Sequence, residues 1–292
     1  MCASKCGFSG PLNAHTDAHI SHLAGGAYDR DMSDAPLVLI DHVDGDAIAT
    51  VSLNNPGKRN ALSLAMMCAL IDALKTVSEI DGVRGILLAA NGPVFSAGHD
   101  FADMAGADLE FLRKLLLTCT ELMTLVQQLP QPVLAKVHAL ATAAGCQLVA
   151  SCDLAISADS AHFALPGGKG GLFCTTPLVA VARTISRKRA LELAMTGDQI
   201  DAATAADWGL INRAVPEESL DEACADLIRR STRGSALAKS IGKAAFYAQI
   251  DLEQPKAYAY AIEVMAANAA GADGQEGIAS FLEKRPPVWQ NR

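Results

Sequence analysis

The stretch from Leu140 to Thr176 constrains the fold of this chain more than any other part of it. It reads LATAAGCQLVASCDLAISADSAHFALPGGKGGLFCTT. The pattern predicts a small-residue turn, a short helix over 144–150, a buried strand over 154–157 and a glycine-rich loop. Small residues before a helix let a ligand approach the backbone N–H groups at its N-terminus closely. The stretch therefore predicts a ligand site built mainly from backbone.

Strand and helix signals alternate up to about residue 215, which is typical of an α/β fold. Asp44-Gly45-Asp46 separates the first two apolar runs and is a hairpin signal. The last part, roughly 230–292, reads as three helices. The predicted strands lie at 37–43, 47–53, 85–90, 133–137, 154–157 and 211–215, and the longest predicted helices lie at 64–77 and 109–129.

The first 33 residues differ in composition from the rest, being rich in Gly, His, Ala, Ser and Asp. We predict a disordered tail over 1–33, a core over 34–229 and a helical region over 230–292. The tail histidines are His15, His19 and His22, and a loose tail is favoured over a metal site. The tail has no apolar segment for secretion and only two cations, too few for a mitochondrial presequence.

Composition excludes several kinds of partner. The 292 residues carry a net charge of −8, which argues against a nucleic-acid surface. No apolar run approaches the ~18 residues that a transmembrane helix needs. The 8 cysteines have no metal-ligand spacing and are expected to be reduced thiols. We predict a cytoplasmic protein with no nucleic-acid partner, no membrane span and no metal.

Five segments follow one another with the order and spacing of a known family. FSAGHDFADM is similar to F-x-A-G-x-D-(aliphatic), and ATAAGCQLVASCDLAI is similar to G-G-G-x-E-L-A-x-x-C-D. NNPGKRNALS, ALELAMTGDQIDAATAADWGLINRAVP and FLEKRPPVW are similar to the remaining motifs. Over about residues 37–292 the chain thus resembles the crotonase (enoyl-CoA hydratase/isomerase) superfamily.

The resemblance implies a crotonase-like spiral of ββα units, followed by a C-terminal helical region that builds homotrimers, often paired into hexamers. It also implies a coenzyme A thioester as substrate or ligand, no permanently bound cofactor, and a lyase-type role in fatty-acid metabolism. Three cations are candidate CoA contacts. Lys58 and Arg59 match the family's phosphate-facing loop, and Lys284 matches a position that often reaches CoA from a neighbouring subunit. Ordinary solvated charge is the alternative for all three.

Two small-residue turns, 96–99 and 141–146, can each present a backbone N–H to the oxyanion that forms on a thioester carbonyl. The resemblance places the two oxyanion-hole amides at His99 and Ala144, with Ala97 beside the bound CoA thioester. Either turn alone is weak support for an oxyanion hole, because small-residue turns before helices are common.

The chain departs from the family at two catalytic positions. A family hydratase carries a glutamate after the Gly-Cys pair and another after Phe-x-x-Pro, where this chain has Gln147 and Gly167. Hydration of an enoyl thioester needs groups that activate water and deliver a proton, which neither residue does at neutral pH. Thr175 falls near the place where some family isomerases carry an aspartate.

Two interpretations stay open. One is an acyl-CoA enzyme with a different reaction, such as an isomerase, hydrolase or decarboxylase. The other is a non-catalytic acyl-CoA binder that kept the fold. We expect that glutamates restored at 147 and 167 raise hydration if the oxyanion hole is intact.

Overall fold

The computed structural model describes residues 35–42 and 47–291. The predicted tail over 1–33, its histidines and the predicted hairpin turn at 44–46 lie outside the described residues. Contacts group the chain from Pro36 onward into one unit, which holds both the sheet and the C-terminal helices.

A six-stranded sheet runs in the order β1-β2-β3-β4-β6-β9. Its first two strands are antiparallel, with Val38 opposite Leu53, and all other neighbours are parallel. Each of the six strands predicted from the sequence is present, most with slightly different ends. The bounds are Val38–Asp41 (β1), Ile48–Leu53 (β2), Gly85–Ala90 (β3), Val133–Val137 (β4), Leu154–Ala158 (β6) and Arg213–Val215 (β9).

A second, three-stranded sheet was not predicted. Its order is β5-β7-β8, and its strands are Ala141–Thr142 (β5), His162–Ala164 (β7) and Ile200–Asp201 (β8). Strand β5 leads into α4 (Ala144–Ser151), every residue of which is buried. The small sheet thereby fixes the N-terminus of a helix inside the core.

Helices α1 (Leu64–Ser78) and α8 (Leu220–Ser231) pack against the larger sheet, and α3 (Leu109–Gln128) packs against α1. Helix α1 begins where Ser63 Oγ accepts a hydrogen bond from Met66 N at 3.1 Å. Helix α3 ends just before Pro130 and Pro132, as predicted. The other helices before the C-terminal region are Phe101–Met104 (α2), Thr175–Thr184 (α5), Arg187–Thr196 (α6) and Ala202–Trp208 (α7).

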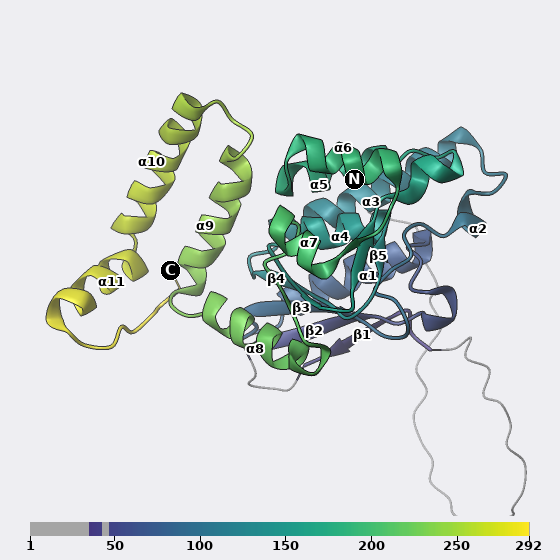
Figure 1. The fold of residues 1–292 in the computed structure, drawn as a ribbon. Helices are drawn as coiled ribbons and strands as arrows, with labels where there is room; N and C mark the ends of the chain where they lie inside the picture. The colour runs from purple at the N-terminus through teal and green to yellow at the C-terminus, as the bar shows by residue number, and fades with distance from the viewer. Residues whose placement is uncertain (1–34, 43–46, 292) are drawn as a thin grey trace, which may run out of the picture. The chain divides into compact units, whose positions relative to one another are not determined.

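The last region contains the three predicted helices, α9 (Ala236–Gln249), α10 (Gln254–Ala270) and α11 (Ala272–Glu283). Helices α9 and α10 run side by side in opposite directions (Figure 1). Apolar side chains on these helices are strongly exposed, among them Tyr258, Ile262, Met265, Phe281 and Leu282. No helix in the described part of the chain combines the length and apolar character needed to cross a membrane.

A buried ion pair joins α9 to Asp153, the residue just before β6. Lys243 Nζ lies 2.7 Å from Asp153 Oδ2, and their side chains are 10% and 14% exposed. The same ammonium donates to the carbonyls of Val126 and Gln131, at 2.8 and 2.9 Å. Tyr247 OH donates to Asp153 Oδ1 at 2.9 Å. Because these charged and polar groups satisfy one another, the pair fixes the position of α9.

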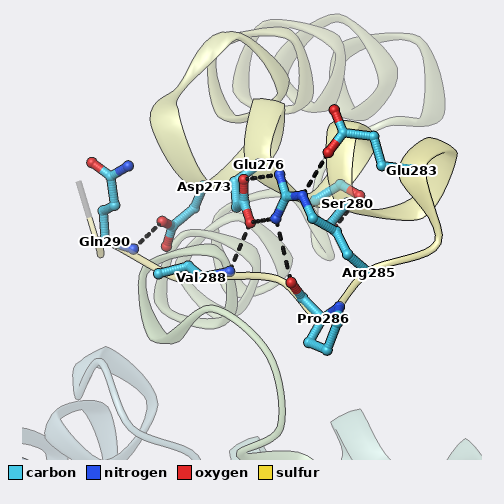
Figure 2. Close-up of polar contacts among 9 residues, drawn as sticks. Asp273, Glu276, Ser280, Glu283, Arg285, Pro286, Val288 and Gln290 are labelled. Atoms are coloured by element: carbon cyan, nitrogen blue, oxygen red, sulfur yellow. Dashed lines mark hydrogen bonds and ion pairs between the residues drawn. The ribbon is translucent and has the colours of Figure 1, made fainter.

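The end of the chain folds back along α11, as Figure 2 shows. Glu276 accepts hydrogen bonds from the Arg285 guanidinium, at 2.6 and 2.9 Å, and from Val288 N at 2.7 Å. Asp273 accepts from Gln290 N at 2.6 Å. The Arg285 contact lowers the pKa of Glu276 to about 2.

Candidate functional site

The two small-residue turns of the sequence meet in space. Thr142 N donates to Ser96 O at 3.0 Å, which joins the turns backbone to backbone. Gly98 has φ +85°, and a Cβ there would lie 2.8 Å from Ala143 Cβ and 3.2 Å from Ala144 N. Only glycine at position 98 lets the turns approach this closely. The structure therefore brings the segments that carry the His99 and Ala144 amides together.

Among the described residues, the amides of Ala97 and Gly98 donate hydrogen bonds, whereas those of His99 and Ala144 do not. Ala97 N donates to Arg59 O at 3.0 Å, and Gly98 N donates to Ser96 Oγ at 3.3 Å. In the part of the chain that the structure describes, neither His99 N nor Ala144 N donates a hydrogen bond to another residue. Ala144 is the first residue of α4. The positive end of the helix dipole therefore strengthens the attraction of its N–H for a negatively charged oxygen.

Ala143 holds a conformation that favours glycine. Its φ is +51° and its ψ is −119°, a combination that costs on the order of 1–3 kcal/mol for a residue with a Cβ. Ala143 N donates to Ala164 O at 2.9 Å, and Gln147 N donates to Ala143 O at 3.0 Å. These bonds keep the strained residue in place and set the direction of the Ala144 N–H.

A buried asparagine, Asn60, stabilises the turn at 96–99 through hydrogen bonds. Asn60 has φ +50°, and its Nδ2 donates to the carbonyls of Asn91 and Val94, at 2.7 and 3.0 Å. Its Oδ1 accepts from Asn55 N at 2.8 Å, and its carbonyl accepts from Ser96 Oγ at 2.8 Å. Sequence reasoning missed this role of Asn60, although an Asn in a turn-rich loop is a known signal for αL backbone.

A cavity of about 100 Å³ opens beside the two turns. Five sequence-predicted site residues line it: Ala97, His99, Ala144, Gly167 and Thr175. The other lining residues are Phe101, Met104, Leu116, Ala143, Leu172, Phe173, Cys174, Thr176 and Pro177.

The two positions of the missing glutamates differ in placement. Gln147 is buried on α4, its Oε1 is 3.8 Å from the Sγ of Cys119 in α3, and it is not among the lining residues. Gly167 lines the cavity, and its N–H donates to Cys174 Sγ at 3.3 Å. A Cβ at 167 would overlap Leu172 O and lie 2.7 Å from Cys174 Sγ. A glutamate restored at position 167 therefore requires a shift of the glycine-rich loop, and the expected gain in hydration stays a prediction.

The titratable side chains of the cavity are neutral at neutral pH. His99 Nδ1 lies 3.2 Å from Leu62 O, which only accepts, so Nδ1 carries the proton. His99 Nε2 is buried and has no hydrogen-bond partner within 35–42 and 47–291, and burial lowers the pKa of the ring. Burial likewise raises the pKa of the Cys174 thiol. Of the described residues that line the cavity, none is Asp, Glu, Lys or Arg.

Two of the three candidate CoA cations lie near the cavity. Lys58 Nζ pairs with Asp100 Oδ2 at 3.2 Å, and its side chain is 63% exposed. The adjacent Arg59 receives its backbone hydrogen bond from Ala97, which lines the cavity. Lys284 ends α11, which packs against α9 and α10, and it is not a lining residue. Among the described residues no cluster of His, Cys, Asp and Glu could hold a metal.

Known proteins resemble this chain along most of its length. It is 44% identical over 247 residues to enoyl-CoA hydratase domain-containing protein 3, mitochondrial, from Rattus norvegicus, covering 84% of this chain and 82% of that protein. The structure of the human protein of that name superposes with a TM-score of 0.83 at 42% identity, covering 87% and 100% of the two chains. An enoyl-CoA hydratase structure from Mycobacterium smegmatis gives 0.84 at 44% identity, covering 87% and 99%.

These relatives correct one prediction. The rat protein and its human counterpart are both named as mitochondrial. The cytoplasmic location predicted from residues 1–33 is therefore wrong by this comparison. The prediction depended on the low number of cations in a segment that lies outside the described residues.

The family profile described as Enoyl-CoA hydratase/isomerase matches residues 43–292. The match includes both turns, the cavity and the C-terminal helices. Together with the α/β architecture and the solved structures of similar fold, it shows that this chain belongs to the enoyl-CoA hydratase/isomerase family.

Proposed function

We propose that this chain binds a coenzyme A thioester with its carbonyl oxygen between the N–H groups of His99 and Ala144. The observation that carries the proposal is that the two turns meet beside one cavity, with neither amide donating to an acceptor among the residues that the structure describes. Rigid backbone donors suit a developing oxyanion, and one such donor typically contributes about 2.7–4 kcal/mol to the transition state.

Lys58 and Arg59 meet the CoA phosphates in this proposal, because their loop is hydrogen-bonded to the turn that carries Ala97. Lys284 reaches CoA only from another copy of the chain. Self-association into trimers or hexamers is accordingly part of the proposal, and the exposed apolar side chains of α10 and α11 support it. No permanently bound cofactor is required.

The proposed reaction is not two-carboxylate hydration. Gln147 faces Cys119, and Gly167 has no room for a side chain. What the cavity supplies is oxyanion stabilisation, with the Thr175 hydroxyl as a nearby polar group. This suits an isomerase, hydrolase or decarboxylase step on an acyl-CoA. The second candidate is a non-catalytic acyl-CoA binder, which the uncharged lining favours.

A matched pair of ligands tests the proposed carbonyl contact. Butyryl-CoA has the thioester carbonyl, and the thioether S-butyl-CoA lacks it but is otherwise similar. We expect butyryl-CoA to bind at least about 10-fold more tightly in isothermal titration calorimetry, which corresponds to about 1.4 kcal/mol. Equal affinities would show that the two amides do not hold the carbonyl oxygen.

A further inference from the structure

We infer that the cavity selects thioesters whose acyl chain is an uncharged hydrocarbon and rejects those whose chain ends in a carboxylate. The inference rests on the proposed function and names the substrate class of the same site. It also excludes the decarboxylase among the candidate reactions, because a decarboxylase substrate carries a carboxylate on its acyl group. The two amides serve the thioester carbonyl, which every CoA thioester has. Selection among acyl groups therefore has to come from the other lining side chains.

Apolar side chains form much of the lining. They come from α2, α3 and the glycine-rich loop, and Phe101 and Leu172 are 72% and 51% exposed. Large apolar side chains exposed around a cavity are unfavourable in water and gain when an apolar group covers them. A hydrocarbon chain covers Phe101, Met104, Leu116, Leu172 and Phe173 without any need for a polar partner.

The same lining offers little to a second negative charge. None of the described lining residues is Lys or Arg. The His99 ring is neutral and commits its Nδ1–H to Leu62 O, so it has no further N–H to donate. The remaining side-chain donors are the thiol of Cys174 and the hydroxyls of Thr175 and Thr176. A carboxylate held against this lining would lose part of its hydration with no cation among the described lining residues to replace it, which is unfavourable.

The size of the cavity sets the matched probes. The cavity has a volume of about 100 Å³, so the probes carry short acyl groups. Butyryl-CoA and succinyl-CoA both have four-carbon acyl groups, and they differ chiefly in the terminal carboxylate. Free CoA reports the part of binding that needs no acyl group.

Calorimetric titration of the full chain with these three ligands tests the inference. We expect succinyl-CoA to bind at least about 10-fold more weakly than butyryl-CoA and no more tightly than free CoA. Equal affinity of the two thioesters, both above free CoA, overturns the inference and leaves the proposed function standing. If neither thioester binds more tightly than free CoA, the proposed function fails, and the inference fails with it.

A variant tests the stated cause. Leu116→Lys adds a cation on a flexible side chain to the lining. We expect it to reduce the ratio of the butyryl-CoA affinity to the succinyl-CoA affinity at least 3-fold, on the order of 0.7 kcal/mol. Leu117→Lys, at an exposed neighbouring position on α3, should leave the preference unchanged. Met104→Lys makes the same test from α2 if Leu116→Lys does not fold. An unchanged preference in the folded cavity variant contradicts the inference.

Discussion

Gly98 packs against Ala143 so closely that a Cβ at position 98 would lie 2.8 Å from Ala143 Cβ. We expect Gly98→Ala to weaken butyryl-CoA binding at least about 10-fold, because it forces the two turns apart and moves the His99 and Ala144 amides. Calorimetric titration measures the change.

Gly82→Ala is the matched control for this variant. Gly82 has φ +88°, close to the +85° of Gly98, but a Cβ there would meet nothing within 4 Å. Both variants have similar backbone strain, and only Gly98→Ala disturbs the turns. A similar loss of butyryl-CoA affinity in both variants would contradict the role assigned to the contact between Gly98 and Ala143. An unchanged affinity in both variants would contradict it as well.

The strain at Ala143 predicts a stabilising substitution. Ala143→Gly relieves a backbone conformation that costs about 1–3 kcal/mol, at an entropic cost of roughly 0.4–1 kcal/mol. We expect the free energy of unfolding in urea to rise by about 1 kcal/mol at fixed protein concentration. Ala144→Gly, in the first turn of α4, should instead lower it by up to ~1 kcal/mol. A destabilised Ala143→Gly variant would show that Ala143 is not strained.

The buried pair Asp153–Lys243 predicts a large loss of stability in Lys243→Met. Removing one partner of a buried pair typically costs about 3–5 kcal/mol, because the other charge stays buried. The exposed pair Lys256–Glu253, with side chains 72% and 77% exposed, is the control. Lys256→Met should change the free energy of unfolding by less than ~1 kcal/mol. A similar loss in the free energy of unfolding for the two variants would refute the structural role of the buried pair.

The neutral His99 ring predicts a pH dependence of stability. Burial lowers its pKa below the ordinary value of 6.5, so the unfolded chain binds more protons between the lowered pKa and that value. Stability from this residue is present above pH 6.5 and is lost as pH falls through this window. His99→Asn, whose amide can still donate to Leu62 O, should remove this part of the pH dependence. An NMR titration that puts the pKa of His99 above 6.5 would contradict the account.

Exposed apolar side chains of the last helices predict self-association. Phe281 is 82% exposed on α11. We expect Phe281→Glu to convert an oligomer into smaller species in light scattering, because a charge replaces an apolar contact. Leu117→Glu changes another exposed apolar position on α3, 68% exposed, and should leave the mass unchanged. A monomeric parent protein would contradict the proposed trimer.

The sequence predicted much of this fold because its signals were local. Apolar runs located the six strands of the main sheet, and the small-residue turns at Gly98 and Ala144 were recognised from composition and motif spacing. The strands of the second sheet are two or three residues long, too short to give a periodic signal.

Local sequence signals did not predict the placement of Gln147, Asn60 and Gly167, because it depends on tertiary contacts. The Gln147 side chain faces Cys119, 28 residues earlier in the chain, and the bracing role of Asn60 depends on carbonyls from a distant loop. The crowding at Gly167 comes from Leu172 and Cys174 in the same glycine-rich loop, whose closure no spacing rule predicts.

The most direct test of the central claim measures binding and hydration of crotonyl-CoA on the same preparation. The account predicts binding at micromolar concentration, tighter than free CoA, together with hydration far slower than a typical enzyme turnover of about 10 per second. Hydration at or above that rate would contradict the account, because it would show that water is activated without the two glutamates.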